Sequence, residues 1–264
     1  MASGKRQAEL WGPSAPMWAE RQEAYSLPLS AWLIEQCGVS AGQHVLDAGC
    51  GAGGAMVLAA ERGARVTGTD VAPEMLAIAR SRVPAGEFIV TDTESLPFAD
   101  AAFDVSLAAN SLQFTEHPVV ALRELARVTK RGGLIGICCF AAPEHSNFAT
   151  LGAAVRKLFV QPPHFEGPFS LSPPAKLFDV ISQAGLVIRE TAEIDLVRSH
   201  AHFEELWEGQ SGAGATRYSV SQLGAEPVKQ AMAAAAQQFT DESGKLTLSN
   251  RFVVVVASTA IEKH

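Results

Sequence analysis

Short apolar runs alternate with helical patterns of apolar and polar residues between Val45 and Phe140. Strand-like runs occur at 64–70, 87–90 and 103–107, after a first one that begins at Val45. Segments with apolar residues at helical spacing separate these runs. A repeated order of strand and helix predicts a parallel sheet with right-handed crossovers. We therefore expect a doubly wound α/β fold.

The pattern is less regular on both sides of this region. Residues 10–38 carry apolar side chains at roughly helical spacing, with a kink expected at Pro28. Helical patterns also interrupt the strands after Phe140. The predicted organisation is a helical cap segment at 1–40, a core at 41–140, a lid insertion at 141–170, a continuation of the core at 171–199, a helical lid insertion at 200–240 and a closing strand at 241–264.

A glycine-rich turn, VLDAGCGAGG at 45–54, is the strongest local signal. Its glycines permit positive φ and let a ligand lie against main-chain N–H groups. Gly49, Gly51 and Gly54 also satisfy the G-x-G-x-x-G spacing of dinucleotide folds, which alone is a weak match. Asp47 ends the strand beside the turn, where its charge would repel a pyrophosphate. The acid instead favours a ligand with a cationic end.

Two further acids follow strands that run in the same direction. Asp70 ends the strand at 64–70, where a carboxylate can accept both hydroxyls of a ribose. Asp92 follows the strand at 87–90 and can accept from an adenine amine, while the N–H of Thr93 can donate to a ring nitrogen. Parallel strands end at one edge of the sheet, so these groups indicate a nucleoside site.

The motifs from Val45 to Phe140 occur in the order and spacing of class I methyltransferases that use S-adenosylmethionine (SAM). VLDAGCGAG resembles motif I of that class, and the chain is most similar to its small-molecule branch, which includes the ubiquinone-biosynthesis C-methyltransferases. The resemblance implies a Rossmann-like, seven-stranded, mostly parallel sheet with an antiparallel last strand and a helical cap or lid. The cofactor residues that it and the strand ends suggest are Trp18, Tyr25, Asp47, Gly49, Cys50, Gly51, Gly53, Asp70, Val71, Met75, Asp92, Thr93, Glu94, Asn110 and Gln113.

Composition limits the other partners of the chain. It has 264 residues, 47% of them hydrophobic, and a formal net charge of −7. A broad nucleic-acid surface would need a basic patch, which the sequence lacks. No apolar run has the length of a membrane span, and the first residues lack a signal core, so we expect a cytoplasmic protein. The cysteines form no ligand cluster, so we expect reduced thiols and no metal.

The resemblance implies methyl transfer from SAM to a small, fairly apolar acceptor. Many members of the class carry histidines after the fourth strand, but this chain has Gln113 and Phe114 there, and neither side chain is a base. His145 and His164 are then the candidate bases, whereas His117 is better explained as a helix cap. The phenylalanines that suggest an aromatic acceptor pocket are Phe148, Phe159, Phe165 and Phe169.

Two other functions stay open from the sequence. An oxidoreductase that uses NAD could carry the same glycine-rich turn. A protein that binds SAM without transferring its methyl group would be consistent with the missing histidines. The sequence does not identify the acceptor or the oligomeric state.

Overall fold

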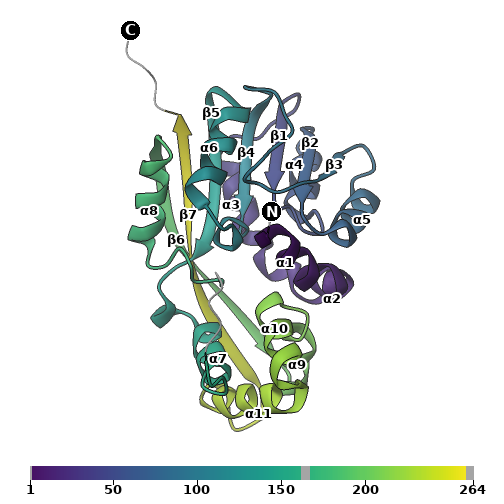
Figure 1. The fold of residues 1–264 in the computed structure, drawn as a ribbon, viewed down its shortest axis with the longest axis vertical. Coiled ribbons are helices and arrows are strands. Elements are labelled where there is room, and N and C mark those ends of the chain that lie inside the picture. Colours follow the sequence, from purple (N-terminus) through teal and green to yellow (C-terminus); the bar gives the residue numbers. More distant parts are fainter. Residues whose placement is uncertain (1, 162–166, 260–264) are drawn as a thin grey trace.

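The computed structural model describes residues 2–161 and 167–259, which form one seven-stranded sheet with helices on both faces (Figure 1). The strand order is β3-β2-β1-β4-β5-β7-β6. All neighbours from β3 to β5 are parallel, and β7 is antiparallel to both β5 and β6. This confirms the predicted fold class. The strands are β1 His44–Ala48, β2 Arg65–Asp70, β3 Glu87–Val90, β4 Phe103–Ala109, β5 Thr129–Phe140, β6 Leu186–His200 and β7 Leu246–Thr259.

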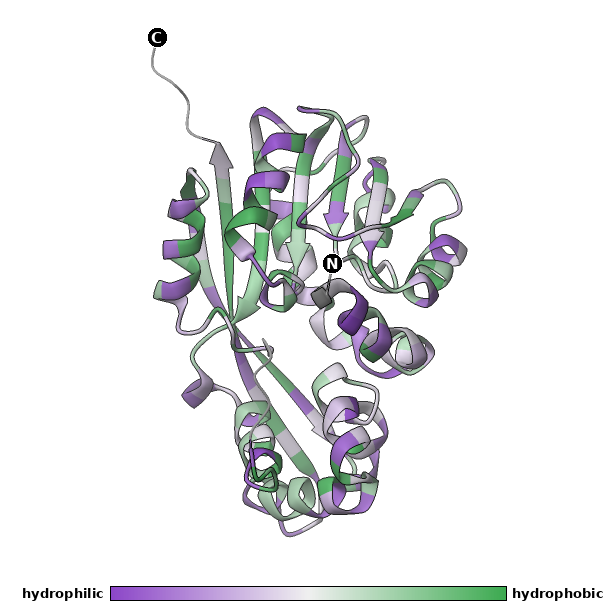
Figure 2. Ribbon diagram, viewed as in Figure 1, coloured by the Kyte–Doolittle hydropathy of each residue, from purple (hydrophilic) through white to green (hydrophobic). Residues whose placement is uncertain are grey.

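Two hydrophobic cores lie on opposite faces of the sheet. Helices α3 Glu23–Gln36, α4 Gly54–Glu61 and α5 Pro73–Arg82 supply one core. Helices α6 Pro118–Val128 and α8 Pro174–Gln183 supply the other. Cys138 points into the first core and Cys139 into the second, as expected for neighbours on one strand. Figure 2 shows the result as hydrophobic central strands and helices striped with polar residues.

The β6–β7 hairpin is much longer than the other strand pairs of the described sheet. β6 continues to His200, and β7 already begins at Leu246, so the two strands extend past the rest of the sheet into a second body (Figure 1). Leu246 and Leu248 of β7 form a third core there with side chains from the surrounding helices. These helices are α7 Asn147–Arg156, α9 Phe203–Gln210, α10 Gly214–Leu223 and α11 Ala225–Ala236.

The N-terminal segment lies between the two bodies. It consists of α1 Ala2–Trp11, a short 3-10 turn, α2 Ala15–Arg21 and α3. The breaks fall at Gly12 and Gln22, whereas Pro28 lies inside α3. Helix α1 contacts α10 of the second body, and α2 contacts α5 of the core (Figure 1). The segment therefore bridges the carboxyl edge of the sheet and the second body.

Two smaller features complete the fold. Gly132 and Gly133 lie within β5, where the register against β4 shifts and Gly132 has φ +77°. Thus an irregularity of one strand, not a loop, accommodates these glycines. Among the described residues, no helix is long and apolar enough to cross a membrane.

Candidate functional site

A cavity of about 630 Å³ lies between the carboxyl edge of the sheet and the second body. The end walled by the glycine turn, with Asp47, Gly51 and Asp70, is called the turn end below. The end walled by Gly152 and Arg156 is called the α7 end. The N-terminal helices and α10 contribute further wall residues. Its volume lies in the range of ordinary small-molecule sites, which are roughly 300–1,000 Å³.

Three glycines of the turn have positive φ, and each has a different reason to be glycine. Gly49 has φ +76°, and a Cβ there would lie 2.4 Å from the Cβ of Ser111. Gly51 has φ +54° and open space toward the cavity, with the Nε1 of Trp18 at 3.8 Å. Gly53 has φ +87°, and its Cβ would lie 2.9 Å from that of Ala79. Gly49 and Gly51 therefore form the cavity wall, while Gly53 lets α4 approach α5.

Asp47 is a buried carboxylate that forms no ion pair with any described residue. Its side chain is 1% exposed, and Oδ1 has no hydrogen-bond partner among the described residues. Burial raises the pKa of Asp47 to about 8, and the charges of Asp70 and Glu23 add to this effect. A ligand cation at this position would stabilise the ionised form. The orphaned oxygen therefore fits a cationic ligand group.

Asp70 fixes the turn from the end of β2. Its Oδ2 accepts from the N–H of Gly51 at 2.9 Å, and its Oδ1 accepts from that of Ala72 at 2.9 Å. Burial raises the pKa of Asp70, and these backbone hydrogen bonds oppose the shift. The backbone N–H groups of Gly49 and Cys50 donate to the carbonyl of Thr69, at 2.7 and 2.8 Å. The strand ends thus hold the turn open toward the cavity, with Asp70 on its wall.

Glu23 is a wall residue that sequence reasoning missed. It is 8% exposed, its Oε1 accepts from the N–H of Gly54 at 3.0 Å, and its Oε2 pairs with Arg82. Arg82 also donates to the carbonyl of Ala52 at 3.0 Å. The pair therefore joins α3 and α5 to the first turn of α4. No local pattern reveals it, because the two side chains come from different helices far apart in the sequence.

The predicted adenine residues divide between the cavity and the neighbouring loop. Asp92 and Thr93 line the cavity, and α1 covers them, since a side chain at Gly4 would come within 2.7 Å of Asp92 Oδ2. Glu94 points elsewhere. Its Oε1 accepts from the N–H groups of Glu116 and His117, at 2.7 and 2.8 Å, just before α6. Glu94 thus fixes the start of that helix and does not line the cavity.

The other predicted cofactor residues also differ in their positions. Cys50, Val71 and Met75 line the turn end, where Met75 packs in a small cluster with Ala52. Burial raises the pKa of the Cys50 thiol well above its ordinary value. The thiol is therefore protonated and inert at neutral pH.

Asn110 occupies a strained backbone position at the end of β4. It has φ +63° and lines the cavity. The Nε2 of Gln113 donates to its Oδ1 at 2.6 Å, which fixes the amide. Gln113 itself is buried behind it and is not part of the wall. A non-glycine residue in this region is uncommon and often belongs to a functional site.

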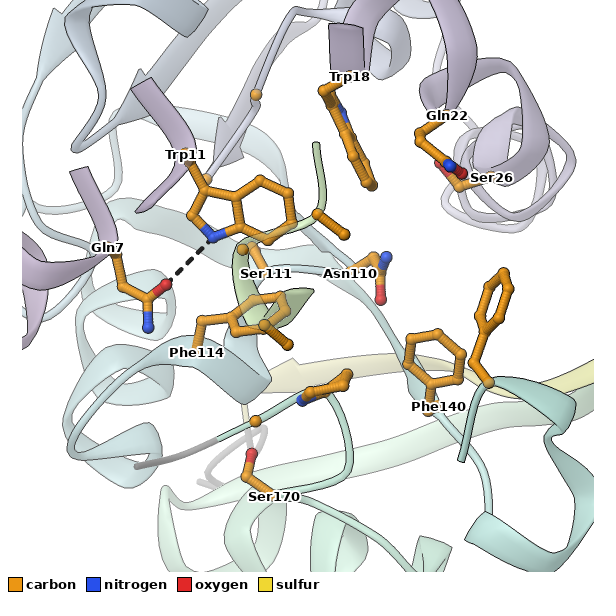
Figure 3. Close-up of a pocket in the computed structure, with 18 of the residues that line it drawn as sticks. Gln7, Trp11, Trp18, Gln22, Ser26, Asn110, Ser111, Phe114, Phe140 and Ser170 are labelled. Carbon is orange, nitrogen blue, oxygen red and sulfur yellow. Dashed lines mark hydrogen bonds between the residues drawn. The ribbon is translucent and has the colours of Figure 1, made fainter. Parts of the chain in front are cut away.

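Aromatic rings surround the turn end (Figure 3). The ring centroids of Trp11 and Trp18 are 5.1 Å apart, and those of Trp11 and Phe114 are 5.6 Å apart. The indole N–H of Trp11 donates to Gln7 at 3.1 Å. Sequence reasoning singled out Trp18 but missed Trp11 and Phe114. The rings come from three different segments, so only the tertiary structure brings them together.

A second aromatic group forms the middle of the cavity. Phe140 lies between Phe169 and Phe252, with centroid distances of 4.9 and 4.3 Å. Tyr25 and Phe148 adjoin it, with centroids 6.1 Å apart. The Tyr25 hydroxyl donates to the carbonyl of Leu196 at 2.7 Å and accepts from Asn250 at 3.0 Å. Burial raises the pKa of Tyr25, so its phenol stays neutral.

Of the two candidate bases, only His145 lies within the described residues. His145 is exposed in the short turn before α7 and does not line the cavity, so the structure gives no support to it as a base. His164 and Phe165 lie outside the described residues. His117 is the residue before α6, with Pro118 at the first helical position. Phe159 does line the cavity, on the side of the second body.

Part of this chain is similar to known methyltransferases. Residues 46–137 match the methyltransferase domain family. The chain is 43% identical over 101 residues to malonyl-[acyl-carrier protein] O-methyltransferase of Serratia marcescens, covering 38% of this chain and 40% of that protein. It is 34% identical over 119 residues to demethylmenaquinone methyltransferase of Renibacterium salmoninarum, covering 45% and 50%. The chain thus spans half or less of these relatives' lengths.

Solved structures share the fold over a greater length. The YcgJ protein of Bacillus subtilis superposes with a TM-score of 0.62 at 19% identity, covering 90% of this chain and 100% of that one. Geranyl diphosphate C-methyltransferase of Streptomyces coelicolor, solved with Mg²⁺, geranyl diphosphate and S-adenosyl-L-homocysteine, gives 0.52 at 17%, covering 88% and 78%. At these identities the likeness concerns the fold. The family match over residues 46–137, the glycine turn and the fold together support a class I methyltransferase domain in this part of the chain.

Proposed function

We propose that this chain transfers a methyl group from SAM to a small, fairly apolar acceptor. The observation that carries the proposal is the turn end of the cavity. There a buried, unpaired Asp47 adjoins glycine N–H groups and Asp70. A ligand with a cationic end and a ribose complements this arrangement. A pyrophosphate would face the acids instead, which disfavours NAD.

We assign the cofactor contacts by chemistry. Asp47 would face the cationic end of SAM, and Asp70 would accept from the ribose with lone pairs that its two backbone hydrogen bonds leave free. Asp92 and Thr93 would read the adenine edge under α1. Met75 and Trp18 would cover the flat faces of the nucleoside. Bound SAM supplies an electrophilic methyl group on a sulfonium.

The protein's contribution to the reaction is alignment and exclusion of water. The aromatic group around Phe140 adjoins the turn end and offers an apolar surface for the acceptor. An in-line displacement needs the attacking atom and the methyl carbon to be held in contact in a dry site. Helix α1 and the second body cover the two sides of that site. The proposal gives His145 no role.

Calorimetry and product analysis test the proposal. SAM and S-adenosylhomocysteine should bind the purified chain, while NADH should not. A panel of apolar phenols, quinols and carboxylic acids, incubated with SAM that carries a labelled methyl group, should yield a labelled product. Binding of NADH in preference to S-adenosylhomocysteine would contradict the assignment of the turn. Binding of SAM without label transfer to any acceptor would favour a non-transferring role.

A further inference from the structure

Helix α7 turns one face of small residues and a single arginine toward the cavity. The wall residues Ala149, Gly152, Ala153 and Arg156 follow the spacing of one helical face. A Cβ placed on Gly152 would meet nothing within 4 Å. The first three residues therefore leave room for a ligand along the helix. Arg156 follows them at the end of that open face.

Arg156 is the only lysine or arginine in the described part of the cavity wall. Within residues 2–161 and 167–259 its guanidinium has neither a hydrogen bond nor an ion pair, whereas Lys229 of the same body pairs with Glu204 at 2.6 Å. The acids of the wall are Glu23, Asp47, Asp70 and Asp92. All four belong to the segments around the glycine turn. The cavity is thus acidic at the turn end and basic at the α7 end.

The described part of the wall near Arg156 is otherwise apolar or uncharged. Val155 and Phe159 come from the same segment, and Met232 comes from α11. Thr216 and Ser219 of α10 add two hydroxyl groups. Within residues 2–161 and 167–259, an elongated ligand with an apolar body would therefore meet one charged group at this end. That group is a cation with planar, forked donors, which suits a carboxylate or a phosphate.

We propose that the acceptor carries an anionic substituent, a carboxylate or a phosphate, which Arg156 binds at the α7 end. The inference rests on the proposed function, because it takes the turn end to be the cofactor site. The acids at the turn end repel the same substituent. The two ends of the cavity therefore fix the direction of the acceptor and present its other, apolar end to the methyl group.

The test uses three twelve-carbon probes that differ only in their polar group. Dodecanoate, dodecyl phosphate and dodecanol are titrated into the full chain saturated with S-adenosylhomocysteine. We expect the better anion to bind the wild type about tenfold more tightly than dodecanol, as for one charge-assisted contact. Arg156→Gln should remove that preference, and Arg156→Lys should keep part of it. Lys157→Gln is the matched control, since the Lys157 side chain is exposed like that of Arg156 but is not part of the wall.

Several outcomes would overturn the proposal. The wild type could bind the anions and dodecanol equally, or bind neither anion. The preference for the anion could also survive Arg156→Gln, or be lost equally in Lys157→Gln. The comparison of the two anions identifies which substituent the arginine reads. Calorimetry with S-adenosylhomocysteine alone reports on the proposed function separately. If S-adenosylhomocysteine does not bind, the same titrations are made without it, and an Arg156-dependent preference would then refute only the cofactor assignment.

Discussion

Replacing Asp47 by asparagine should stabilise the ligand-free protein at neutral pH. The carboxyl group is 1% exposed, and its pKa is raised from 3.8 to about 8, chiefly by burial. The folded state therefore holds this proton more tightly than the unfolded state does. Below pH 4 the Asp47 carboxyl group is protonated in both states, so it lowers the free energy of unfolding very little. As the pH rises from 4 to 8 the unfolded state ionises first, so stability falls.

The size of the effect follows from the difference between the pKa values of Asp47 in the unfolded and folded states. One pKa unit corresponds to about 1.36 kcal/mol, so a folded pKa near 8 costs at most about 4 kcal/mol at pH 7. Water in the cavity reduces the cost, and we expect a gain on the order of 1–4 kcal/mol for Asp47→Asn. Asparagine has nearly the same shape, and its oxygen can still accept the hydrogen bond that the backbone of Ala109 gives to Asp47.

Urea unfolding of wild type and variant at pH 4, 5.5, 7 and 8 measures the difference. Other titrating groups largely cancel in that comparison. Asp104→Asn is the control with the opposite sign, because hydrogen bonds from the His44 N–H and from Lys130 lower the pKa of Asp104. Asp104 stabilises the protein above its unfolded pKa, and this contribution is lost as the pH falls. A difference between wild type and Asp47→Asn that is constant from pH 4 to 8 would refute the reasoning.

Four more predictions concern the turn and the residues that hold it. Asp70→Ala should weaken SAM binding by about 1–3 kcal/mol, since it leaves donors unpaired, and an unchanged calorimetric affinity would contradict its ribose role. Gly51→Val should abolish SAM binding, because the added branch enters the open space beside Trp18 and φ is +54°. Gly53→Ala should instead lower the thermal stability of the protein, because the added Cβ would lie 2.9 Å from the Cβ of Ala79. Glu23→Ala should lower the free energy of unfolding by about 1–3 kcal/mol through the lost contacts to Gly54 and Arg82, and an unchanged urea midpoint would count against that clamp.

Several features of the site could be predicted because they depend on neighbours in the sequence. The turn needs glycines at positive φ, and Gly49, Gly51 and Gly53 all have it. Asp47, Asp70 and Asp92 each end or follow a strand, and parallel strands bring such residues to one edge of the sheet. Periodicity and turn residues were enough to place these groups on one cavity wall. Glu94 and Gln113 also follow strand ends in the sequence. Their side chains, however, hydrogen-bond to neighbouring residues and do not line the cavity.

The strand pairing that holds the second body could not be predicted in this way. Residues 191–196 of β6 alternate polar and apolar side chains, which is typical of a strand, but this pattern does not show which strand pairs with them. They are strand because β7 pairs with them along their whole length. Helix α7 then packs on α11 against Leu246 and Leu248. This pairing and packing decide where Arg156 lies.

The sequence by itself determined the class of fold, the glycine turn and the acids around it, because each follows from local backbone requirements and from strand order. Only the tertiary structure decided what closes the cavity. Helix α1 lies against Asp92, the Glu23–Arg82 pair joins α3 to α5, and Tyr25 bonds to Asn250 of β7. These partners are far apart in the chain. Their contacts depend on the shapes and burial of whole elements, which no short pattern encodes.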